Sequence, residues 1–88
     1  MAIQWAVTAQ RAKVSPTELD DLLKGNVHAN VANRFGLSVT AVEDFIGGRA
    51  HADVATWLGL PNMASAEELA RELGREGAIG FLVARLFA

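Results

Sequence analysis

Apolar residues recur three or four positions apart on both sides of Gly36. They are Val31 and Phe35 before the glycine, and Val42, Phe45 and Ile46 after it. Side chains at these spacings share one face of an α-helix. A glycine can end a helix because it adopts positive φ readily. The pattern predicts a helix, a tight glycine turn and a second helix over residues 28–46.

The two residues after Gly36 indicate where the second helix begins. Ser38 is a favourable N-cap, because its hydroxyl can accept a hydrogen bond from a free backbone N–H of the first turn. Leu37 precedes this cap and can contact Val42 as a hydrophobic staple. We therefore expect the second helix to start at Ser38.

Ala32, Gly36 and Val42 form a characteristic spacing, with the glycine four residues after the small residue and the aliphatic residue six further on. With this spacing, residues 28–46 resemble the helix-turn-helix superfamily of DNA-binding domains. In that superfamily the small residue lets the two helices approach closely and the glycine makes the turn. We expect Ala32 and Gly36 to lie where space is short. The resemblance implies a DNA-binding protein, such as a small transcriptional regulator or a recombination accessory protein.

The resemblance also implies which residues would contact double-stranded DNA. The second helix enters the major groove with its N-terminal and outward residues toward the base edges. In this sequence those residues are Ser38, Val39, Thr40, Glu43 and Asp44. Contacts to phosphates would have to come from the neighbouring cations Lys24, Arg34 and Arg49. The adjacent carboxylates of Glu43 and Asp44 disfavour DNA binding by the second helix, because they repel phosphates.

Two further segments carry helix-start signals. Ser15 is followed by Pro16 and then Glu18, which is a capping box with proline at the first helical position, and this helix should stop at Gly25. Ser65 and Glu68 form a second capping box, whose helix should end at Gly74. Residues 61–64 would then lengthen the turn before it.

The chain repeats part of the motif after 23 residues. Six of the ten residues in 28–37 recur at the equivalent positions of 51–60. A repeat of this kind usually means that one supersecondary unit is used twice. We expect the same local structure in both copies, a helix that closes at Gly36 or at Gly59. The second copy diverges after its first half.

The two ends of the chain leave alternatives open. Residues 2–13 are rich in helix formers, but residues 3–7 also alternate in the manner of a strand. Residues 78–87 are the most apolar segment and are interpreted as a C-terminal helix that is buried on most sides. A strand pairing of 3–7 with 78–87 would instead make the fold α+β. Residues 78–87 could also be apolar because they form a homodimer.

Composition favours an all-α fold. The chain has 88 residues, which is enough for one domain over residues 1–88, and sixteen of them are alanine. We expect five to seven short helices that contain a helix-turn-helix and a second, diverged copy of its first half. The absence of cysteine and of a recognisable signal peptide favours a cytoplasmic protein. The apolar run 78–84 is too short to cross a membrane.

Enzymatic chemistry has little support in the sequence. There is no glycine-rich phosphate loop and no defensible catalytic triad, so we expect no catalytic residues, no cofactor and no metal site. His28 and His51 occupy equivalent repeat positions and are interpreted as polar residues near helix starts. Trp5 and Trp57 are interpreted as packing residues.

Charge keeps two functions open. The net charge is −2, but residues 24–51 carry +1 and residues 52–76 carry −3, so the motif is the less acidic part. One hypothesis is DNA binding, and the alternative is a helical protein–protein interaction module that reuses the same scaffold. A basic face around the second helix would favour DNA. An apolar or acidic face there would favour a protein partner.

Overall fold

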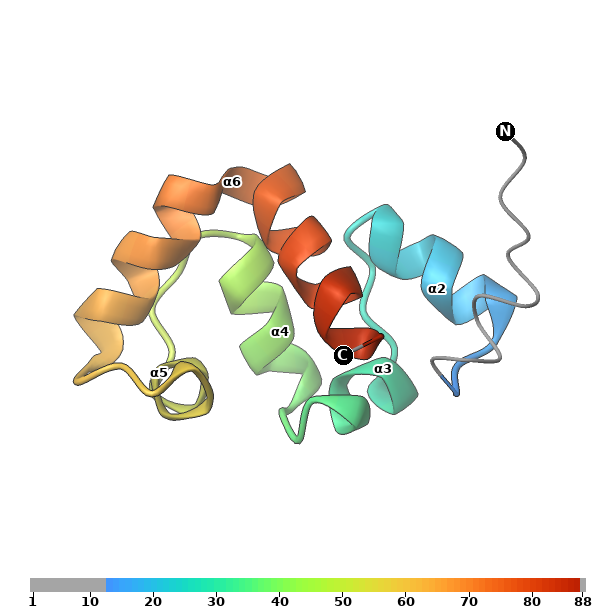
Figure 1. Ribbon diagram of the computed structural model, residues 1–88, viewed down its shortest axis with the longest axis horizontal. Helices are drawn as coiled ribbons and strands as arrows, with labels where there is room; N and C mark the ends of the chain where they lie inside the picture. The colour runs from blue at the N-terminus through green and yellow to red at the C-terminus, as the bar shows by residue number, and fades with distance from the viewer. Residues whose placement is uncertain (1–12, 88) are drawn as a thin grey trace.

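Residues 13–87 are described by a computed structural model and form five helices (Figure 1). In chain order these helices are α2 (Pro16–Leu23), α3 (Ala29–Arg34), α4 (Val39–Ile46), α5 (Ala52–Leu58) and α6 (Met63–Leu86). No strand occurs in this part of the chain, which confirms the all-α prediction and excludes a strand at residues 78–86. The helix or strand expected within residues 2–12 lies outside the described residues.

Helix α6 is bent at Gly74 and holds the other helices together. Its first half packs against α5, and its second half starts near the end of α2 and runs beside α4 toward α3 (Figure 1). Residues 78–86 are helical, as predicted, but the helix is buried on one face, through Ala78, Ile79 and Leu82, and not on most sides. Phe81, Val83 and Leu86 are only partly buried, and Phe87 is exposed. None of the described helices is both long enough and apolar enough to cross a membrane.

Two of the predicted helix starts are confirmed. The Ser15 hydroxyl accepts from the Glu18 N–H at 3.1 Å, and the Ser15 N–H donates to the Glu18 carboxylate at 2.7 Å. This reciprocal pair is the expected capping box, with Pro16 at the first helical position. Ser38 caps α4, because its hydroxyl accepts from the Ala41 N–H at 3.1 Å.

The predicted start at Ser65 is wrong. Helix α6 begins at Met63, and its N-cap is Asn62, whose side-chain oxygen accepts from the Ser65 N–H at 2.8 Å. Asn and Ser are nearly equal as N-caps, so local propensity does not separate them. The earlier start adds a turn of helix and still places Ala66 on the buried face. Ser65 lies inside the first turn of that helix.

The turns that close α3 and α5 are the same structure. Gly36 has a φ of 71°, and the N–H of Leu37 donates to the carbonyl of Ala32 at 3.1 Å. In the second copy Gly59 has a φ of 70°, and the N–H of Leu60 donates to the carbonyl of Ala55 at 2.8 Å. Both are Schellman closures, in which glycine takes the left-handed position.

The inner faces of the two copies also match. Val31 and Val54 are buried, and so are Ala32 and Ala55. His28 and His51 are the N-caps of α3 and α5. The repeat in the sequence is thus a repeat in the structure, as predicted.

Ala32 and Gly36 differ in the space around them. Ala32 is only 1% exposed, as expected for a close helix crossing. A Cβ atom at Gly36 would meet nothing within 4 Å, so the expectation of crowding there is wrong. The glycine is needed for its positive φ and not for its small size.

Replacing Gly36 with valine should lower the free energy of unfolding by about 1–2 kcal/mol, because valine resists positive φ. Gly59→Val should cost a similar amount, since the two turns are equivalent. Gly80→Val is the control: Gly80 is exposed in α6 and has open space around it and no positive φ. Urea denaturation measures all three variants. Equal stability of Gly36→Val and wild type would contradict the assigned turn.

The Glu18 carboxylate should make stability depend on pH. Its pKa lies below the ordinary value of 4.5, chiefly because it accepts a hydrogen bond from the backbone N–H of Ser15. A lowered folded-state pKa adds stability above the unfolded-state pKa, and that stability is lost as the pH falls through the folded value. Wild type should therefore be more stable than Glu18→Gln at pH 7. Thermal unfolding of both proteins should show this difference disappearing in acid, and a constant difference would contradict it.

Candidate nucleic-acid interface

The N-terminal ends of α3 and α4 border one open hollow of about 340 Å³. Its lining is entirely uncharged and consists of Ala29, Asn30, Ala32, Asn33, Leu37, Ser38 and Val39. The Schellman turn at Gly36 creates this arrangement, because it reverses the chain within three residues and sets Ser38 at the start of α4. Polar side chains and helix N-termini are groups that contact phosphates in DNA complexes.

Ser38, Val39 and Thr40 form the predicted contact segment at the start of α4. The Ser38 oxygen already accepts from the Ala41 N–H, which leaves its own O–H free to donate. Thr40 is exposed, whereas Val39 is half-buried and packs partly against the core. Two of these three side chains can therefore offer hydrogen bonds outward.

Asn30 and Asn33 line the hollow but are not among the predicted site residues. They differ in whether their side chains already form hydrogen bonds within the chain. The Asn30 amide donates to the Glu18 carboxylate at 3.2 Å and to the Lys13 carbonyl at 3.4 Å. Asn33 is exposed, and its side chain makes no hydrogen bond to another residue within 13–87. The amide available to a ligand is therefore that of Asn33. Asn33 could have been included in the predicted site, because the sequence pattern already places it on the outer face of the first helix of the motif.

Arg34 is the predicted cation that lies nearest to this hollow in the sequence. It is the last residue of α3, it is exposed, and no carboxylate among residues 13–87 lies within 4 Å of it. The chain leads from Arg34 through the three-residue turn directly to Ser38. Of the predicted site residues, Ser38 and Val39 line the hollow and Thr40 follows them in α4. Arg34 is not part of the lining and is their neighbour only along the chain.

Lys24 and Arg49 are engaged elsewhere. The Lys24 ammonium pairs with Asp20 at 2.9 Å, and this hydrogen bond raises the lysine pKa. The Arg49 guanidinium pairs with Asp44 at 2.8 Å and also donates to the Glu43 carbonyl at 3.3 Å. Arg49 follows the C-terminal end of α4, about 12 Å from Ser38 by helix rise. The structure therefore does not gather these two cations around the start of α4.

The pairing of Arg49 also changes the acidic part of the predicted site. Asp44 is half-buried and its charge is balanced by the guanidinium, whereas Glu43 is exposed and has no ion-pair partner within 13–87. Only one uncompensated carboxylate remains on the outward face of α4. The negative charge of Glu43 and the positive charge of Arg34 cancel, so the surface of the motif is polar and close to neutral.

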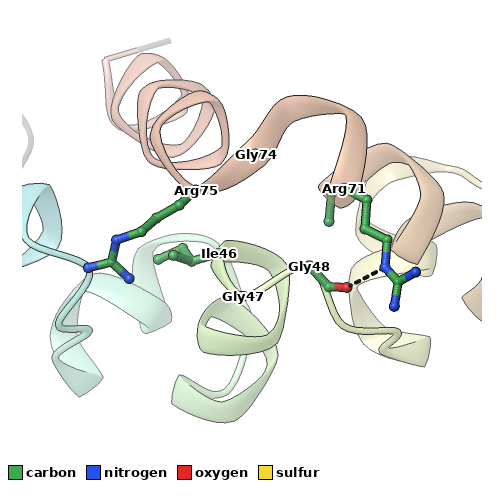
Figure 2. Close-up of a pocket in the computed structure, with 7 residues that line it drawn as sticks. Ile46, Gly47, Gly48, Arg71, Gly74 and Arg75 are labelled. Atoms are coloured by element: carbon green, nitrogen blue, oxygen red, sulfur yellow. Dashed lines mark hydrogen bonds between the residues drawn. The ribbon is translucent and has the colours of Figure 1, made fainter.

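Arg71 and Arg75 flank a second hollow, between the end of α4 and the bend of α6 (Figure 2). Arg71 donates to the Gly48 carbonyl at 3.3 Å and lies 3.6 Å from Glu67. Arg75 donates to the Lys24 carbonyl. Both carbonyls belong to helix C-terminal turns, where cations are favourable. These arginines dock α6 onto α2 and α4, and no sequence pattern indicated this.

Trp57 packs in an aromatic cluster, as predicted. Its ring lies 5.5 Å from Phe35, 6.2 Å from Phe45 and 5.9 Å from Phe81, all in edge-on geometry. The Arg85 guanidinium lies over the Trp57 ring at 5.7 Å. Trp57 occupies the position where the first copy has Arg34, so the two copies present different chemistry. Trp5 lies outside the described residues.

The two histidines are the N-cap residues of α3 and α5. His28 Nε2 lies 2.5 Å from the Asp21 carboxylate, which links α3 to α2. His51 Nδ1 accepts from the Asp53 N–H at 3.1 Å and caps α5. Within the described part of the chain, no three His, Asp or Glu side chains gather closely enough to hold a metal ion.

Comparison of the chain with protein-family models, with curated proteins and with solved structures finds no match.

Proposed function

We propose that this protein binds double-stranded DNA through the start of α4 and the turn that joins it to α3. The observation that carries the proposal is the chemistry of this corner. Its hollow has no carboxylate in its lining, which includes the Asn33 amide and the Ser38 hydroxyl. Arg34, which has no ion pair within residues 13–87, precedes Ser38 by four residues in the chain. Hydroxyl, amide and guanidinium groups contact phosphates and base edges in DNA complexes.

The helix arrangement supports the same proposal. A six-residue α3, a glycine turn and a capped α4 with an outward polar start follow one another in the order that helix-turn-helix proteins use. The Arg49–Asp44 pair supports it further, since it removes one of the two carboxylates that opposed DNA binding. Arg34 supplies the phosphate contact, and Ser38 and Thr40 face the groove.

The small number of cations that can contact phosphates limits the affinity for DNA. Lys24 and Arg49 are neutralised within the chain, so one copy offers Arg34 and few other contacts to phosphates. Counterion release then predicts a slope of log K against log salt of about −1 to −2, far below that of proteins with many phosphate contacts. Binding by one copy should be weak and measurable only at low salt.

A protein partner is the second candidate, and Glu43 favours it. Its exposed carboxylate lies on the outward face of α4 with no ion-pair partner within residues 13–87. A cationic side chain of a partner protein could pair with it, and a nearly neutral polar face suits a protein surface better than a polyphosphate. In this alternative the helix-turn-helix is only a scaffold.

Variants that change one charge at a time should test the DNA proposal. Glu43→Gln should tighten binding to a labelled duplex and Arg34→Gln should weaken it, each about three- to tenfold at low salt. Arg34→Gln should also flatten the salt slope by about one phosphate contact. Fluorescence anisotropy at two salt concentrations measures both effects.

Arg71→Gln is the control for net charge, because it removes one positive charge from α6 beside Gly48, at the end of α4 away from Ser38. Circular dichroism should first show that this variant is folded, since Arg71 also contacts the Gly48 carbonyl. Arg71→Gln should change the affinity much less than Arg34→Gln. Equal losses for the two arginine variants would mean that net charge alone governs binding. No binding by wild type or by Glu43→Gln at low salt would end the DNA proposal and leave the protein partner.

A further inference from the structure

The bend of α6 depends on one glycine. Gly74 has a φ of 73° and a ψ of 176°, a conformation that is open almost only to glycine. The residues on both sides are helical, so one residue interrupts an otherwise continuous helix. A Cβ atom at Gly74 would meet nothing within 4 Å. Glycine is therefore required here for its backbone conformation and not for lack of room.

The bend decides where the second half of α6 lies. The two halves meet at an angle, and only this angle returns residues 75–86 to the side of α4 (Figure 1). A straight α6 would carry Ala78, Ile79 and Leu82 out of the core that buries them. It would also leave the inner faces of the remaining helices uncovered.

We propose that Gly74 is a hinge, and that an opened, straight α6 places residues 75–86 into the core of a second copy of this chain. The product is a domain-swapped dimer. Each copy would recover every core contact that its own helix had made, so only the hinge itself differs between the monomer and the dimer. The vacated position fits residues 75–86 of a second copy, because it is lined by the same core residues that this segment packs against in its own chain.

The contacts at the hinge fit such an exchange. Arg71 and Arg75 lie on opposite sides of Gly74 (Figure 2). The bond from Arg71 to the Gly48 carbonyl joins residues that stay within one copy on opening. The bond from Arg75 to the Lys24 carbonyl would re-form between the two copies. No docking contact is lost in the exchange.

Gly74→Ala tests the hinge, since alanine disfavours the bent conformation and favours continuous helix. We expect this variant to be a dimer by size-exclusion chromatography with light scattering, with unchanged helical circular dichroism. Gly80→Ala is the control, because Gly80 is an exposed glycine of the same helix without positive φ. It should behave as wild type does.

Two further measurements make the test decisive. In a Gly74→Ala dimer mixed from isotope-labelled and unlabelled chains, contacts between the Trp57 and Phe81 rings, 5.9 Å apart in one chain, should become intermolecular. Wild type refolded at about 1 mM should yield a dimer that persists on dilution, because separation requires unfolding.

A folded, monomeric Gly74→Ala would overturn the proposal, and so would a dimer whose Trp57–Phe81 contacts stay within one chain. If Gly74→Ala does not fold, the oligomeric state of wild type refolded at high concentration tests the proposal instead. A persistent dimer supports the hinge, and monomer alone at every concentration rejects it.

Discussion

The packing of the second half of α6 against α4 is the interaction on which the rest of the structure depends. Helices α2 to α5 have only six to eight residues each, and helices this short are marginal in isolation. Their stability must come from burial of one face, and the buried side chains of Phe45 and Leu82 belong to these two helices. The rings of Phe45 and Phe81 lie 5.7 Å apart across the interface. The bend at Gly74 makes this packing possible within one chain.

Features set by neighbouring residues could be predicted from the sequence. The capping box at Ser15 and the cap at Ser38 depend on hydrogen bonds between residues three apart, so the residue types suffice. The closures at Gly36 and Gly59 were recognisable because the same pattern occurs twice. The start of α6 was misplaced because Asn62 and Ser65 are equally good caps, and the choice between them rests on how the whole helix packs.

The candidate site was less predictable, because it depends on charges that meet across turns. Asp44 and Arg49 are five residues apart, and no helical spacing joins them; the turn after α4 does so. Arg71 and Arg75 reach helix ends 23 and 51 residues away in sequence. Of the cations expected to contact phosphates, only Arg34 is free of ion pairs within the described part of the chain. Ser38 and Thr40 at the start of α4 are exposed, but Lys24 and Arg49, two of the three cations expected beside them, form ion pairs within the fold.

The central claim is that ligand contact concentrates at the corner between α3 and α4. Backbone amide chemical shifts recorded during titration with a short DNA duplex at low salt test this claim residue by residue. The account predicts that the amides of Asn33, Arg34 and residues 38–40 move with the added duplex, while those of residues 47–49 and 71–75 stay in place. Movement confined to residues 47–49 and 71–75, or no movement at all, would contradict it.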